Sequence, residues 1–121
     1  MEKVIERFLK YVKYDSRSKA DVMNFPSTPN QLILIKDIAS ELKSIGMKDV
    51  TMDEYGYVSA ALPSNTEAAL PTIGFIAHVD TSPEMPGENV NPRIIENYDG
   101  EDIILNKELN IILSPKEFPG L

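Results

Sequence analysis

The sequence predicts an α/β fold in which a layered sheet is packed against helices. Three observations lead to this fold class: two amphipathic helical segments, a pair of segments typical of a β-hairpin, and one continuous apolar run. Helices combined with strands in this way favour a layered architecture. The chain has 121 residues, 42% of them hydrophobic, which suffices for one domain with a core.

The first helix is expected over residues 4–12. Apolar residues recur there at helical spacing, with charged residues between them, which predicts about three turns of amphipathic helix. The apolar set is Val4, Ile5, Phe8, Leu9 and Val12. Residues 14–26 are polar and irregular, so a loop is expected after the helix.

The second helix has clear start and stop signals. Thr28 can cap it, Pro29 suits the first helical position, and Gln31 completes a capping box. Gly46 supplies the left-handed stop. The expected buried stripe consists of Leu32, Ile35, Ile38, Ala39, Leu42 and Ile45.

Strands are expected next. Residues 49–53 and 57–62 flank a short turn at 54–56 and form a predicted hairpin, followed by a surface loop over 63–71. The apolar run 72–77 lies between prolines and predicts a strand buried on both faces. We therefore expect both helices to pack on a sheet that contains this strand.

The last third of the chain is rich in prolines and turns. Pro83, Pro86 and Pro92 exclude regular elements around them. Short strands are expected at 93–95, 102–105 and 111–113, around turns at 99–100 and 106–107. The acids at 99–102 form a turn without the spacing of a calcium-binding EF-hand.

Composition excludes several classes of function. The chain has no cysteine, which rules out disulfides and thiolate zinc sites, and it has a single histidine. Its net charge of −7 argues against nucleic acid as a partner. No apolar segment approaches the length of a membrane span, and the N-terminus does not have the pattern of a secretory signal, so a cytoplasmic location is expected.

The acidity is concentrated in the second half. Residues 1–61 hold nine acids and nine bases, whereas residues 62–121 hold ten acids and three bases. Such a surface is ordinarily a solvated face, and it also provides a field that attracts cations or amines.

One constellation stands out chemically, His78-Val79-Asp80, directly after the apolar run. Residues two apart in an extended segment point to the same side, so His78 and Asp80 can face one cavity at the end of a strand. Histidine is the commonest zinc ligand and is usually oriented by a carboxylate. Asp80 can orient His78 or ligate a metal directly. A lone histidine at a strand end is more often a hydrogen-bonded structural residue than a ligand. Thr81 and Ser82 are interpreted as turn residues.

The sequence resembles the peptidase T family, bacterial tripeptide aminopeptidases within a superfamily of two-zinc exopeptidases. The resemblance runs from residue 1 to residue 121. The His-x-Asp motif is shared by the whole superfamily. The Thr-Ser-Pro and Asn-Val-Asn-Pro sequences that follow it narrow the resemblance to the family. The matching segments are Glu6-Arg7-Phe8-Leu9, Pro26-Ser27-Thr28, Gly74-Phe75-Ile76-Ala77-His78-Val79-Asp80-Thr81-Ser82-Pro83, Asn89-Val90-Asn91-Pro92, Leu113-Ser114-Pro115 and Phe118-Pro119.

The resemblance implies specific roles. His78 would ligate one of two zinc ions, and Asp80 would be the catalytic-site carboxylate that holds its imidazole. The complete enzyme would carry a zinc-bearing α/β catalytic domain and a smaller lid domain that supports a homodimer. Its substrates would be tripeptides, from which it removes the N-terminal residue in the cytoplasm.

Family members are expected to be much longer than 121 residues. The remaining zinc ligands and the general base should lie after residue 121, so residues 1–121 would be the N-terminal portion of the catalytic domain. A hydrolytic zinc site needs about three protein ligands per metal, so we expect this chain to be inactive alone. The alternative is a non-catalytic α/β fragment or interaction module.

Overall fold

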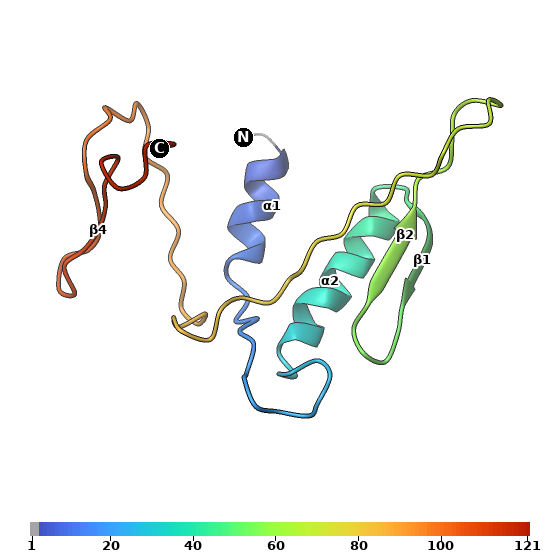
Figure 1. The fold of residues 1–121 in the computed structure, drawn as a ribbon, viewed down its shortest axis with the longest axis horizontal. Coiled ribbons are helices and arrows are strands. Elements are labelled where there is room, and N and C mark those ends of the chain that lie inside the picture. Colours follow the sequence, from blue (N-terminus) through green and yellow to red (C-terminus); the bar gives the residue numbers. More distant parts are fainter. Residues whose placement is uncertain (1–2) are drawn as a thin grey trace.

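The computed structural model describes residues 3–121, and it confirms the α/β class (Figure 1). The described residues form two helices and two separate two-stranded antiparallel sheets, β1 with β2 and β3 with β4. The elements are α1 Lys3–Tyr11, α2 Gln31–Ser44, β1 Lys48–Met52, β2 Val58–Ala61, β3 Ile103–Asn106 and β4 Ile111–Leu113.

The predicted hairpin is confirmed and packs on α2. Its turn is held by the Asp53 carboxylate, whose Oδ1 accepts the N–H groups of Tyr55 and Tyr57 at 3.0 and 2.8 Å. Gly56 follows with a φ of +89°, and a Cβ atom there would lie 3.1 Å from Ile35 Cδ1 and 3.2 Å from a methyl carbon of Leu32. The turn therefore sits directly against the first half of α2.

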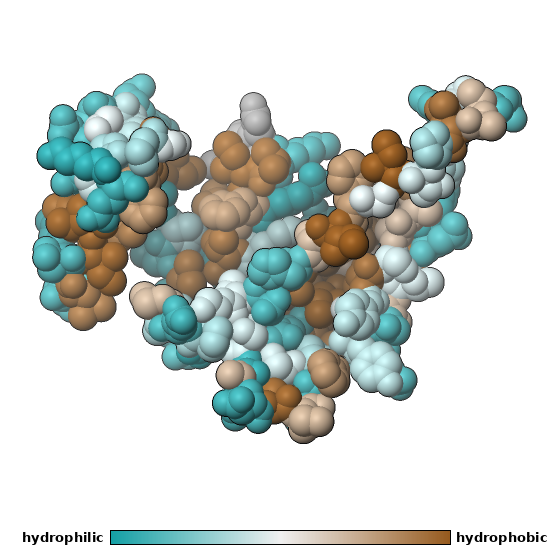
Figure 2. Space-filling view, viewed as in Figure 1, coloured by the Kyte–Doolittle hydropathy of each residue, from teal (hydrophilic) through white to brown (hydrophobic). Residues whose placement is uncertain are grey.

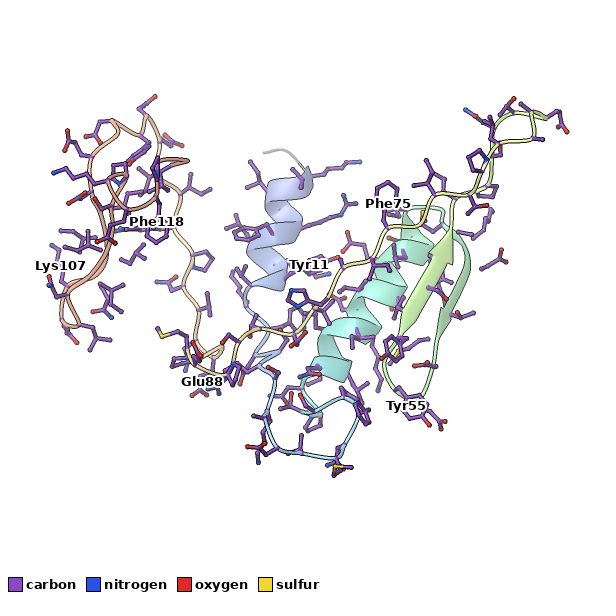
Figure 3. All side chains as sticks on the ribbon, viewed as in Figure 1. Tyr11, Tyr55, Phe75, Glu88, Lys107 and Phe118 are labelled. Carbon is purple, nitrogen blue, oxygen red and sulfur yellow. The ribbon has the colours of Figure 1, made fainter. Side chains whose placement is uncertain are left out.

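Helix α1 is joined to α2 by polar side chains, not by its apolar stripe. Glu41 on α2 pairs with Arg7 and accepts a hydrogen bond from the Tyr11 hydroxyl at 2.6 Å. Asp37, one turn earlier, pairs with Lys10 at 2.6 Å. Figure 3 shows Tyr11 on the side of α1 that faces α2. The expected apolar face is left largely in solvent, with Val4, Ile5 and Phe8 exposed.

Two details expected for α2 are wrong. Thr28 does not close a capping box; its hydroxyl donates to the Arg17 carbonyl oxygen at 2.7 Å, and Asn30 occupies the N-cap. The expected stripe is buried only at Ile35, and the other buried apolar residue within 3–121 is Leu34. The helix lies between α1 and the hairpin, so its buried positions face two sides and not one sheet.

The apolar run 72–77 is not a buried strand. It has no strand pairing in the structure, and the predicted packing of both helices on a sheet containing it is wrong. Phe75 is 94% exposed and Ile76 is fully exposed. Figure 1 shows the segment running extended from the loop after β2 past α2 towards α1, and Figure 3 labels Phe75 on it. Its burial requires partner strands that residues 3–121 do not provide.

The C-terminal part forms its own small unit, drawn apart from the helices in Figure 1. The strand expected at 102–105 is found as β3, and the one at 111–113 as β4. The strand expected at 93–95 is wrong, because this stretch follows Pro92 without pairing. Instead the Arg93 guanidinium donates to the Ile104 carbonyl and ties the connecting segment to β3. Gly100, with a φ of +85°, lies in the expected turn.

The fold leaves an unusually large surface. Its accessible area is 10347 Å², whereas a compact monomer of this mass exposes about 6500 Å². Apolar residues appear at the surface over α1 and over the region of α2 and the hairpin (Figure 2). Within residues 3–121, no helix is long and apolar enough to cross a membrane.

Candidate metal centre

The histidine and aspartate singled out by their spacing form a pair. His78 Nδ1 lies 3.0 Å from Asp80 Oδ1. A carboxylate only accepts, so the imidazole donates from Nδ1, and the Nε2 lone pair is left for another partner. This is the tautomer that a metal-bound histidine adopts when a carboxylate orients it. The expectation that both side chains share one side of the segment is therefore met in the structure.

The pair is open to solvent. The His78 side chain is 84% exposed and that of Asp80 is 42% exposed. Among the described residues, no group of three or more His, Cys, Asp or Glu side chains lies close enough to hold a metal ion. The pair fits one zinc ligand with its orienting carboxylate, and a complete site needs further donors.

The backbone that carries the pair is anchored by residues from the loop after α1. Arg17 and Thr81 form a parallel bridge, in which Ser18 N–H donates to the Thr81 carbonyl at 2.9 Å and Thr81 N–H donates to the Ser16 carbonyl at 3.2 Å. The interpretation of Thr81 as a turn residue is therefore wrong. Ser82, by contrast, does open a turn, since its Oγ accepts from the Glu84 N–H at 3.3 Å.

Ser16 is a functional candidate that sequence reasoning missed. It is 2% exposed, and its hydroxyl donates to the Val79 carbonyl oxygen at 2.8 Å. It lies in a polar stretch interpreted as a loop, and its contact is 63 residues away in sequence. No local pattern distinguishes this buried serine from the half-buried polar residues beside it.

A second contact secures the same region. Arg17 and Asp15 form a two-pronged ion pair, with distances of 2.9 and 3.2 Å, and this pairing lowers the pKa of the Asp15 carboxyl. Gly87 packs against it so closely that a Cβ atom would lie 2.5 Å from Asp15 Oδ1. The segment after His78 and Asp80 is thereby held against the loop after α1. Glu88, the residue after Gly87, is labelled in Figure 3.

Comparison with known proteins identifies the sequence. Peptidase T of Bacillus licheniformis is 60% identical over 119 residues, which are 98% of this chain and 29% of the relative. Peptidase T of Caldanaerobacter subterraneus subsp. tengcongensis is 60% identical over all 121 residues, and that of Clostridium acetobutylicum is 58% identical; each match covers 30% of the relative. The chain belongs to the peptidase T family.

The match to peptidase T confirms the resemblance inferred from the motifs. The chain spans about 30% of the length of the curated relatives it matches and corresponds to their N-terminal portion. A search against protein-family models found no match. Since the identity extends across the whole chain, it includes the segment that carries His78 and Asp80.

Proposed function

We propose that the chain is part of a zinc aminopeptidase that releases the N-terminal residue of tripeptides, and that it supplies one zinc ligand, His78. The observation that carries this proposal is the His78–Asp80 hydrogen bond of 3.0 Å, within a sequence 60% identical to peptidase T. The zinc would be one of a pair, and the complete enzyme would be a cytoplasmic homodimer.

The chain's own part in the chemistry is to present an imidazole. Asp80 holds the Nδ1 proton, which directs the Nε2 lone pair outward and makes the ring a more basic ligand. Zinc bound there would supply Lewis acidity and an activated water. The 84% exposure of His78 leaves its Nε2 accessible to further parts of a binding site.

The other donors would come from the larger part of the enzyme. About 70% of each relative has no counterpart in these 121 residues, which gives ample length for the remaining ligands and a general base. The single histidine cannot supply a hydrolytic site by itself. We therefore propose that residues 1–121 alone do not hydrolyse tripeptides.

The proposal is tested by tripeptide hydrolysis in the longer polypeptide that carries this sequence. Asp80→Asn should keep some of the bound zinc but lower the rate by up to ~100-fold, since a lost orienting carboxylate costs that much in affinity or activity. Asp21→Asn, a change of the same kind in an exposed loop, should match the unaltered enzyme. Equal rates in Asp80→Asn and the unaltered enzyme would refute the role of Asp80.

A second function class is favoured by one observation. Phe75 and Ile76 are almost completely exposed, and exposed apolar patches mark interaction surfaces. A non-catalytic interaction module would use this surface and would not need His78. Zinc binding that depends on His78 in the longer polypeptide would exclude that alternative.

A further inference from the structure

We infer that Ser16 is a positioning residue that sets the orientation of Asp80 and, through it, of His78. Ser16 is among the most buried residues within 3–121, and it lies where the loop after α1 meets the segment of the candidate site. For zinc binding the inference rests on the proposed function, but for the orientation of the two side chains it does not.

Ser16 is hydrogen-bonded to the peptide groups on both sides of Asp80. The group before it contributes the Val79 carbonyl, which accepts the Ser16 hydroxyl at 2.8 Å. The group after it contributes the Thr81 N–H, which donates to the Ser16 carbonyl at 3.2 Å. One residue therefore holds both planes that flank the Asp80 Cα atom, and these planes fix the direction of its Cβ bond.

Packing cannot give the same orientation. His78 is 84% exposed and Asp80 is 42% exposed, so few neighbours restrict their rotamers. The hydrogen bonds to Ser16 are the restraint, and a carboxylate held in place selects the imidazole tautomer by accepting the Nδ1 proton.

Ser16 can act as a restraint because it is itself anchored. The carbonyl of the next residue, Arg17, accepts the Thr28 hydroxyl at 2.7 Å and the Gln31 side-chain amide at 3.1 Å. Gln31 is the first residue of α2 and is 5% exposed. Hydrogen bonds through Ser16 and Arg17 thus connect the backbone around Asp80 to the first residue of α2.

Ser18 provides a matched control. Its hydroxyl also donates to this segment, to the Thr81 carbonyl at 3.1 Å. Its own backbone N–H donates to the same oxygen at 2.9 Å, so the carbonyl keeps a donor when the hydroxyl is removed. In Ser16→Ala, by contrast, the Val79 carbonyl loses the hydroxyl that holds it.

The test uses the nitrogen-15 spectrum of the imidazole, which is unambiguous because the chain has one histidine. At a pH where the ring is neutral, the unaltered 121-residue chain should show mainly the Nδ1–H tautomer. Ser16→Ala should lose that majority, whereas Ser18→Ala should keep it and Ser16→Thr, which retains a hydroxyl, should restore it. If Ser16→Ala changed the tautomer only by unfolding the chain, the hydroxyl of Ser16→Thr would not be expected to restore it.

Two results would contradict the inference that Ser16 positions Asp80. An unchanged tautomer in Ser16→Ala shows that the hydroxyl does not position Asp80. Rapid hydrogen exchange of the Thr81 amide in the unaltered chain shows that the contact with Ser16 is not formed. A parallel zinc titration of the longer polypeptide should show affinity lowered ~10-fold by Ser16→Ala; no zinc binding at all would refute the proposed function while leaving the tautomer result standing.

Discussion

The Tyr11 hydroxyl donates a hydrogen bond of 2.6 Å to the Glu41 carboxylate and so joins α1 to α2. Arg7 pairs with the same carboxylate. Burial, and after it this hydrogen bond, raises the pKa of Tyr11 to about 12. The hydrogen bonds from Tyr11 and Arg7 lower the pKa of Glu41. The two helices are therefore held together by charged and polar groups where the sequence suggested apolar packing.

Removing the Tyr11 hydroxyl should destabilise the helix pair. Tyr11→Phe keeps the ring but loses a hydrogen bond to a charged acceptor, which costs about 1.5–3 kcal/mol. Urea unfolding followed by circular dichroism measures the change. Tyr55→Phe, in the exposed hairpin turn, serves as the control and should have little effect. Equal unfolding midpoints for the two variants would show that the Tyr11–Glu41 contact carries no stability.

Stability should depend on pH at both extremes. In the folded state the pKa of Tyr11 is raised from its ordinary value of 10.0 to about 12. The contribution of the protonated hydroxyl to folding stability is therefore complete below pH 10 and declines as pH rises towards 12. Glu41 has a lowered pKa, so its contribution is present above its ordinary range and is lost as pH falls through the folded pKa. Urea midpoints should thus form a plateau around neutral pH. Tyr11→Phe should flatten the alkaline decline, and an identical decline in that variant would contradict the assignment.

Gly56 should be hard to replace, for two reasons that can be separated. In Gly46→Ala the new side chain has open space around it, and only the positive φ of 91° is unfavourable. This change should lower the free energy of unfolding by about 1 kcal/mol. Gly56→Ala meets a similar φ and also the side chains of Ile35 and Leu32, which should add ~1 kcal/mol or more. Thermal unfolding of both variants measures the difference, and equal costs would mean that the hairpin turn does not pack on α2.

Short-range features of the fold could be predicted from the sequence. The hairpin, the strands β3 and β4, and the pairing of His78 with Asp80 all follow from residues close together in the chain. Their patterns are alternation, turn residues and a two-residue spacing. These three features need no partner from a distant part of the chain, whereas the Thr28 hydroxyl, also placed by a local pattern, bonds instead to the Arg17 carbonyl oxygen.

Long-range features could not be predicted. The run 72–77 has the composition of a buried strand, but burial depends on neighbours, and none pairs with it within the described residues. Ser16 lies in a polar stretch whose partner is 63 residues away. Helix α1 shows the same limit, because Arg7, Lys10 and Tyr11 find acidic partners on α2 and its apolar side is left facing outward.

The exposed run should make the 121-residue chain self-associate. Phe75 and Ile76 lie on an extended, unpaired segment, which is a template for strand pairing between copies. Light scattering should show an average mass that rises with concentration, and Phe75→Lys should reduce the rise. Met23→Lys changes an equally exposed residue in the loop before α2 and should not reduce it. A monomer at all concentrations would contradict this reading of the surface.

The central claim is that His78 is a zinc ligand of a peptidase T enzyme, and the most direct measurement is the zinc content of the longer polypeptide with and without this side chain. Metal analysis of purified protein should show that His78→Ala loses at least one of the two proposed zinc ions, together with tripeptide hydrolysis. Asp21→Asn should retain both. Full zinc content in a folded His78→Ala variant would contradict the account.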